Sequence, residues 1–289
     1  MILKGNTSMQ RLLATPLALL GAVAALPAFA QGGPPPGVGG RPSADTVTVG
    51  LGVGVTTSYD GASEYRVIPG GILRGTFKGH DFQLNGLQLF VDAIPNDTRS
   101  KVDIELGPVA GVNFNRTGDV SDARVAALGE LKTAVELGAR GSIGLRSVLN
   151  RTDKLAFAVT GKWDVAGAHR SHVISPSVEY STLAGRRTFL RLAFTTEFVG
   201  KRYADYYFGI DGAGAVASGL AAWNPDGGLA SIGGNVLASY SLSGRRTGWS
   251  LFGIAAYKRL QGDIAASPIV RDTGSPDQFF SSIGLGYTF

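Results

Sequence analysis

The sequence has 289 residues, of which 42 are glycine and 17% are charged, and it contains no cysteine. The lack of cysteine excludes disulfide bonds, thiolate nucleophiles and cysteine metal sites. A formal net charge of +5 is too small, and its residues are too dispersed, to indicate a nucleic-acid partner.

The first 30 residues have the features of a cleaved signal peptide. Lys4 and Arg11 precede an apolar segment, residues 12–26, and "AFA" at 28–30 provides the small residues that a signal peptidase reads. An uncleaved membrane anchor is the weaker alternative, because Pro16 interrupts the apolar segment. Residues 31–45 are rich in glycine and proline and are expected to form a flexible linker. The chain is therefore predicted to be exported.

Strict alternation of apolar and small or polar residues begins at Thr46. In "TVTVGLGVGVTT", residues 46–57, valine and leucine occupy one face of a strand, and glycine and threonine occupy the other. The same period of two recurs in residues 102–114, 135–146, 155–165 and 190–198. Several of these runs exceed ten residues, which is longer than a typical strand of a soluble sandwich.

Long strands with one apolar face, in an exported chain, indicate an antiparallel transmembrane β-barrel of the outer membrane over residues 46–289. A soluble secreted β-sandwich is the alternative, but it would not need so many long strands. Direct counting gives eleven strands, whereas a barrel with both ends in the periplasm needs an even number. The alternation changes phase at "NGLQ", residues 85–88, and Pro69 interrupts another run. We predict twelve strands, with ten as the alternative.

Connections of two lengths orient the predicted barrel. The short links are "NRTDK" (150–154), "AGRRT" (184–188) and "SGRRT" (243–247), and the long ones cover 115–131, 199–228 and 260–277. Outer-membrane barrels have short periplasmic turns and long external loops. We therefore expect the short links in the periplasm, where they are solvated turns or contact surfaces for periplasmic partners. Their basic residues are Arg186, Arg187, Arg245 and Arg246.

The predicted inner face carries charges of both signs, and buried charges must be paired. These residues are Asp103, Glu105, Glu136, Arg140, Arg146, Lys162, Asp164, Glu179, Arg191 and Glu197. Pairing across the interior predicts a plugged or very narrow lumen.

Catalysis finds little support in the sequence. His80, His169 and His172 are not accompanied by a GxSxG, HExxH or paired acidic motif. His169 and His172 would make at best a partial metal site, and histidines exposed in loops are the preferred interpretation. We expect no enzyme activity, no cofactor and no metal.

Five segments resemble the MipA/OmpV family of outer-membrane proteins. They occur in the family's order and cover essentially the whole predicted barrel. The segments are "GLGVGVTTSYDGASEYRVIPGGILRG" (50–75), "YADYYFGID" (203–211), "SGLAAWNPDGGL" (218–229), "WSLFGIAAYKRLQGDIAASPIV" (249–270) and "QFFSSIGLGYTF" (278–289).

The resemblance implies a barrel in the cell outer membrane. The family's namesake is a scaffold that joins a lytic transglycosylase to a bifunctional penicillin-binding protein in peptidoglycan growth, and other members are described as adhesins or stress-linked proteins. The family brings no catalytic residues. We therefore expect a structural scaffold linked to peptidoglycan synthesis and remodelling, with the lipid bilayer and the barrel assembly machinery as further partners. A narrow barrel that transports or binds a small solute is one alternative, and a surface adhesin is the other.

Two of the segments are rich in tyrosine and acidic residues at predicted strand ends. Tyrosines at a barrel rim are most often an aromatic girdle. Alternatively, these loops fold over the mouth and form a recognition surface, since tyrosine is a rigid contact residue with a polar tip. The candidate residues of these two segments are Tyr59, Asp60, Glu64, Tyr65, Arg66, Tyr203, Asp205, Tyr206, Tyr207 and Asp211. Asp263, in the last long loop, would belong to the same surface.

The alternation continues to Phe289 because the last strand is expected to close against the first. Tyr287 and Phe289 also resemble the C-terminal aromatic signal by which outer-membrane barrels are recognised for assembly.

Deletion of Phe289 should therefore lower the amount of barrel in the outer membrane, because the assembly signal is lost. Quantitative immunoblots of isolated outer membranes measure this amount. Unchanged levels of the deletion variant would contradict the assignment.

Overall fold

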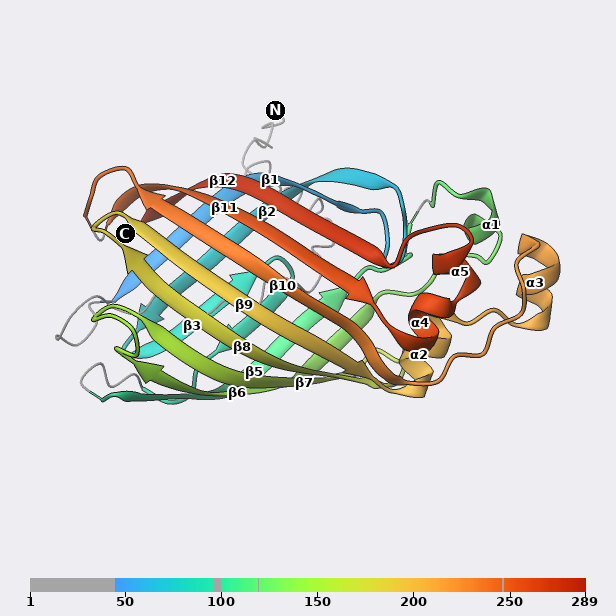
Figure 1. Ribbon diagram of the computed structural model, residues 1–289, viewed down its shortest axis with the longest axis horizontal. Helices are drawn as coiled ribbons and strands as arrows, with labels where there is room; N and C mark the ends of the chain where they lie inside the picture. The colour runs from blue at the N-terminus through green and yellow to red at the C-terminus, as the bar shows by residue number, and fades with distance from the viewer. Residues whose placement is uncertain (1–44, 96–99, 119, 246) are drawn as a thin grey trace, which may run out of the picture.

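The computed structural model describes residues 45–95, 100–118, 120–245 and 247–289. Within these residues, twelve strands form one closed antiparallel barrel (Figure 1). This confirms the predicted fold class and the choice of twelve strands over ten. The predicted signal peptide, residues 1–30, and the linker up to residue 44 lie outside the described residues.

Each strand pairs with its neighbours in the sequence, and β12 pairs with β1 to close the barrel. The strands are β1 Thr46–Thr57, β2 Tyr65–Phe77, β3 His80–Asn85, β4 Gln88–Val91, β5 Val102–Asn113, β6 Ala134–Arg146, β7 Lys154–Asp164, β8 His172–Ala184, β9 Thr188–Val199, β10 Gly228–Ser241, β11 Gly248–Leu260 and β12 Asp277–Thr288.

The two faces of the strands differ as the alternation predicts. On β1 the side chains of Val49, Leu51 and Val53 are 44%, 75% and 56% exposed, whereas Thr48 and Thr56 are buried inside the barrel. An apolar outer face and a polar inner face are typical of a barrel surrounded by lipid.

The phase change at residues 85–88 is a hairpin turn between β3 and β4. Asn85 lies opposite Gln88, and Gly86 has a positive φ of 56°, which suits glycine in a two-residue turn. The hairpin pairs with β2 only from Ile72 onward, so the described part of β2 before Ile72 is paired with β1 alone. Such an edge tolerates Pro69.

The seam between β1 and β12 is lined inside by glycine. Gly52 lies opposite Gly284, and a Cβ atom on Gly52 would lie 2.4 Å from the carbonyl oxygen of Ile283. After the last strand, the backbone N–H of Phe289 donates to the carbonyl of Val47 at 2.9 Å. The seam therefore depends on close backbone approach.

All helices of the described residues lie at one end of the barrel, which we call the loop end (Figure 1). It holds the connections after β1, β5, β7, β9 and β11; the opposite turn end holds those after β2, β4, β6, β8 and β10. The helices are α1 Ala123–Ala126, α2 Lys201–Phe208, α3 Gly212–Ser218, α4 Gly262–Ala266 and α5 Pro268–Arg271. None of the helices in the described part of the chain is long and apolar enough to cross a membrane.

Aromatic side chains project outward near both ends of the barrel, as in the aromatic girdles of membrane barrels. Near the loop end these are Tyr65, Trp163, Phe198, Tyr257 and Phe279; near the turn end they are Phe77, Tyr240, Trp249 and Phe289. The ring of Tyr287 contacts those of Trp249 and Phe289, with centroid distances of 5.2 and 4.8 Å.

Gly52→Ala should lower the free energy of unfolding by about 1–3 kcal/mol, because the new methyl group meets backbone atoms of the seam. Gly286→Ala is the matched control in the same seam. Its Cβ would make ordinary contacts of 3.4 Å or more, and its effect should stay within about 1 kcal/mol. Urea unfolding of the barrel in lipid vesicles measures both. Equal effects would show that the seam does not need the close approach at Gly52.

Candidate functional site: the capped mouth, the charged lumen and the turn end

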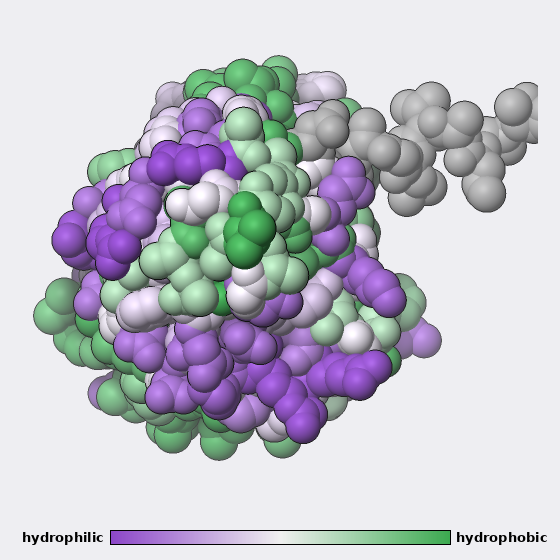
Figure 2. Space-filling view, turned by 90° about the vertical axis from the view of Figure 1, so that its right-hand side faces the viewer, coloured by the Kyte–Doolittle hydropathy of each residue, from purple (hydrophilic) through white to green (hydrophobic). Residues whose placement is uncertain are grey.

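The loop end is covered by an apolar cluster centred on α2, which we call the cap. Inward-facing residues at the ends of β8, β9, β10 and β11 pack against α2, α4 and α5. The buried residues are Val173, Val199, Ala204, Tyr207, Phe208, Ala230, Leu260, Ile264 and Val270. Figure 2 views this end and shows the mouth filled by the described residues, with apolar side chains among polar ones.

Three tyrosines of α2 surround His169 beneath the cap. Tyr203, Tyr206 and Tyr207 recur at helical spacing and therefore share one side of α2. Their ring centroids lie 5.0, 6.4 and 5.8 Å from that of His169. Burial raises the pKa of the Tyr207 phenol, so the ring stays neutral at physiological pH.

His169 connects the cap to the charged wall of the lumen. Its Nε2 lies 3.3 Å from Oε1 of Glu136, and Lys162 Nζ donates to the other oxygen of Glu136 at 2.6 Å. His169 is 3% exposed, so the prediction of an exposed loop histidine is wrong for this residue. His169 is buried because it contacts Glu136 and α2, which are both distant from it in the sequence. The residues next to His169 in the sequence give no sign of either contact.

A second apolar cluster joins the other loops to the cap. It contains Tyr59, Ala62, Val125, Ile210, Leu220 and Ile269. Arg116, buried between the loops, donates from Nη1 to the carbonyl of Tyr207 at 2.9 Å, and burial lowers the pKa of its guanidinium. The hydroxyl of Ser267 donates to the carbonyl of Phe208 at 2.7 Å. These contacts hold α2 from both sides.

The structure separates the predicted tyrosines into two groups. Tyr59 and Tyr207 are buried in the loop clusters, at 4% and 0% exposure, so the girdle interpretation is wrong for both. Tyr203 and Tyr206 pack against the same cap, and the Tyr206 hydroxyl accepts from the N–H of Lys132 at 2.7 Å. Tyr65 faces outward and is 46% exposed, as a girdle residue would be.

The predicted acidic residues serve mainly to position the loops. Asp60 pairs with Lys258 of β11 at 3.0 Å, and Asp211 accepts from the N–H of Gly214 at 2.6 Å at the start of α3. Asp205 is exposed on α2, Glu64 is half-buried, and Arg66 is exposed at the start of β2.

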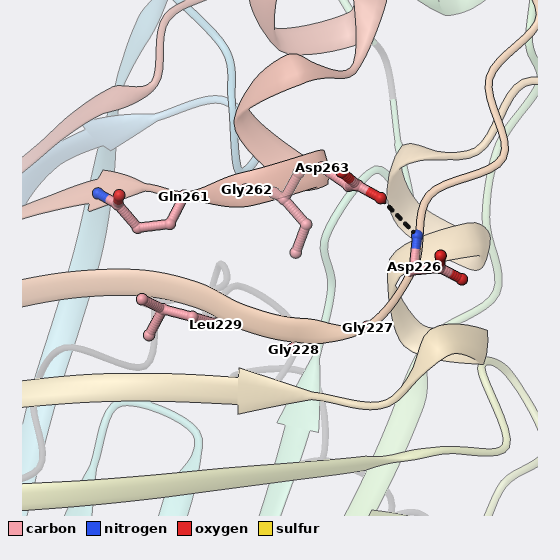
Figure 3. A pocket seen from close by; sticks show the side chains of 8 residues that line it. Asp226, Gly227, Gly228, Leu229, Gln261, Gly262 and Asp263 are labelled. Atoms are coloured by element: carbon pink, nitrogen blue, oxygen red, sulfur yellow. Dashed lines mark hydrogen bonds between the residues drawn. The ribbon is translucent and has the colours of Figure 1, made fainter.

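Asp263 lines a pocket of about 420 Å³ at the loop ends of β10 and β11. Its Oδ2 accepts from the N–H of Asp226 at 2.9 Å (Figure 3), and its carbonyl accepts from Trp223 Nε1 at 3.1 Å. These contacts engage both the side chain and the backbone of Asp263. We therefore interpret the pocket as a space left where two loops pack together, and Asp263 as a residue that joins them. Among the described residues, no group of three or more His, Asp or Glu side chains could hold a metal ion.

The charges of the lumen form networks along one wall, from β5 to β9. Lys154 Nζ donates to Asp103 and Glu105, at 2.6 Å each, and Arg146 also pairs with Asp103. Glu179 accepts from Arg140 and Arg191 at 2.9 and 3.1 Å. This confirms the inward orientation predicted for these residues other than Lys154, for which no orientation was predicted. The opposite wall, built by β1, β2, β11 and β12, carries Ile68, Ile254, Ala256 and Phe280 as an apolar cluster.

The exposed charged side chains of the turn end are mostly basic. Six cations lie there among the described residues: Lys78, Lys101, Arg151, Arg186, Arg187 and Arg245. Arg246, the remaining predicted turn arginine, lies outside the described residues.

Two acidic side chains of the turn end are buried and accept hydrogen bonds from nearby backbone N–H groups. Asp92 accepts two backbone N–H groups at 3.0 Å and is fully buried. Asp153 accepts from the N–H groups of Val148, Leu149 and Asn150. Of the described acids, Asp45 is exposed at this end, besides the carboxyl terminus.

Comparison with known proteins identifies one family. The family described as MltA-interacting protein MipA matches residues 49–289. No curated protein matches the sequence. An outer membrane channel from Pseudomonas putida F1 is 13% identical, over 86% of this chain and 97% of that chain, with a TM-score of 0.44. The outer membrane channel DcaP of Acinetobacter baumannii is 8% identical, over 85% and 96%, with a TM-score of 0.38.

Tyr207→Ala should open the cap, because the buried ring is its central contact. Trypsin cleavage at Lys201 or Arg202, both exposed on α2, should become about tenfold faster or more. Tyr207→Phe is the control: the hydroxyl is buried without a hydrogen-bond partner, so its loss should change the rate by less than about twofold. If Tyr207→Ala is cleaved no faster than the wild type, the cap does not depend on this ring.

Proposed function

Since this chain belongs to the MltA-interacting protein MipA family, we propose that it is an outer-membrane barrel that acts as a binding platform for peptidoglycan-remodelling enzymes. The partners are a lytic transglycosylase and, through it or beside it, a penicillin-binding protein. The barrel anchors the complex in the membrane and contributes no catalysis of its own.

The closed mouth favours a binding platform as the function of the barrel, and it argues against a general pore. The cap covers the loop end, and most described lumen charges are engaged in ion pairs with each other. When the interior of a barrel is filled in this way, its two ends are the surfaces at which other proteins can bind. Solute transport, the alternative function, would require the cap to move.

The basic turn end is the observation that carries the proposal. Short connections lie on the periplasmic side of outer-membrane barrels, so these cations face the compartment that contains peptidoglycan. Six exposed cations with one exposed acidic side chain, among the described residues, favour an acidic protein surface as the partner. Exposed Leu149 and Leu242, at 79% and 50%, add apolar contact area beside Arg151 and Arg245.

The arginine turns are held as one surface by the sheet. The N–H of Ser241 donates to the carbonyl of Arg187 at 2.8 Å, which joins the start of β9 to the end of β10. A Cβ atom on Gly244 would lie 3.0 Å from Nε of Arg187, so the two similar turns lie side by side. Partners would therefore meet clustered guanidinium groups.

Reversal of Arg186, Arg187 and Arg245 to glutamate should reduce recovery of the transglycosylase by about tenfold, because the charge attraction becomes repulsion. Crosslinking on intact cells, followed by affinity purification of the barrel and quantitative mass spectrometry, measures the recovery. Reversal of Lys201, Arg202 and Arg271 at the loop end is the control, with the same change in charge.

The outcomes distinguish the possible functions. If the wild type recovers neither a transglycosylase nor a synthase under crosslinking, the platform proposal is wrong. A partner lost only in the loop-end variant would favour an adhesin. A large single-channel conductance of the wild type in planar bilayers would favour transport.

A further inference from the structure

The lumen contains three arginines around one carboxylate. Arg140 of β6 and Arg191 of β9 each bind one oxygen of Glu179 on β8. Arg74 of β2 lies on the inward face, because it is opposite Thr48 of β1 and Gln83 of β3, both of which are buried. Gln83 in turn lies opposite Phe90 of β4, and the ring of Phe90 lies 5.8 Å from Cζ of Arg140, so the strand register places Arg74 on the side of the lumen that holds Arg140.

This group of residues has two more positive charges than negative ones. Among the described residues, no acid forms an ion pair or a hydrogen bond with Arg74. Neighbouring lumen acids are engaged elsewhere: Asp103 and Glu105 with Lys154 and Arg146, and Glu136 with Lys162. Glu179 pairs with Arg140 and Arg191, so Arg74 is left without an acidic partner among the described residues, and unbalanced charge inside a protein is unfavourable.

Arg140 also presents hydrogen-bond donors that no protein atom accepts. Its side chain is 4% exposed, yet Nε and Nη1 have no partner; only Nη2 reaches Glu179. The ring of Phe90, 5.8 Å from Cζ, fixes the guanidinium from one side. Thr160, opposite Arg140 in the sheet, has a buried hydroxyl that is likewise without a partner. Water would satisfy the donors but would leave the charge uncompensated.

We propose that Arg74, Arg140 and Arg191 form a binding site in the lumen for a small oxyanion with a carboxylate or phosphate group. A guanidinium presents parallel N–H donors that match two oxygens of such a group, and its charge strengthens the hydrogen bonds. The bound anion accepts from the free nitrogens of Arg140, and its charge offsets that of Arg74. This site goes beyond the platform function and does not depend on it.

Calorimetric titration of the purified, folded full chain in detergent with inorganic phosphate, at constant ionic strength, tests the site. The wild type should bind phosphate saturably with one site. Arg74→Gln should weaken binding about tenfold or more, because one charged donor group is lost. Arg259→Gln is the matched control, since Arg259 is a strand arginine that faces outward and pairs with Asp277; its affinity should equal that of the wild type.

Glu179→Gln tests the site in the opposite direction. It removes the carboxylate that competes for Arg140 and Arg191, so phosphate should bind more tightly than to the wild type. This variant decides the question if Arg74→Gln fails to fold, which the heat-dependent gel mobility of the barrel reports. The proposal is overturned if the wild type shows no saturable binding, if Arg74→Gln and Arg259→Gln behave alike, or if Glu179→Gln does not tighten binding.

Discussion

The requirement that every backbone N–H and C=O group facing lipid be paired within the chain determines the rest of this structure. A sheet meets that requirement best by closing on itself, so β12 pairs with β1, although the part of β2 before Ile72 is paired on one side only. Closure in turn demands strict alternation, because each residue faces either lipid or lumen and a shift of one position would invert the whole strand. It also explains the paired glycines of the seam, where backbones approach too closely for a Cβ atom at Gly52.

Closure creates an interior that the protein must fill or leave to solvent, and the two walls differ in how they do so. The wall from β5 to β9 carries charges that pair across neighbouring strands, whereas the opposite wall carries glycine and a few apolar side chains.

At the loop end, α2 seals the interior by packing tyrosines on inward-facing strand ends and on His169. The cap and the charged wall are therefore one connected structure, joined through the contact between His169 and Glu136. Such a closed interior leaves the ends of the barrel as the surfaces available to other proteins, and the turn end presents the clustered arginines.

Sequence patterns were informative wherever a residue's environment depends on its own strand. The long strands and the inward orientation of Arg140 and Glu179 follow from a period of two. The change of phase at residues 85–88 marked the place where the structure forms a hairpin, but it did not by itself predict one. The same patterns were misleading for the loops. Tyr59 and Tyr207 resemble rim tyrosines, and His169 resembles a solvated loop residue, yet all three are buried. Their burial results from contacts between connections that are far apart in sequence, which no local period records.

The sequence by itself determined the barrel and which side chains face the lumen, because lipid imposes the same alternation on every strand; the structure decided between twelve strands and ten. The sequence also indicated that lumen charges of both signs would pair. Only the tertiary structure decided how they pair: it joins Glu179 to two arginines, and it places Arg74 of β2 in register with Gln83 and Phe90, whose ring contacts Arg140. The tertiary structure likewise decided that α2 closes the mouth. The physical reason is that strand pairing depends on neighbours in the sequence, whereas the charge balance of a lumen and the packing of a cap depend on which strands and loops meet across the barrel.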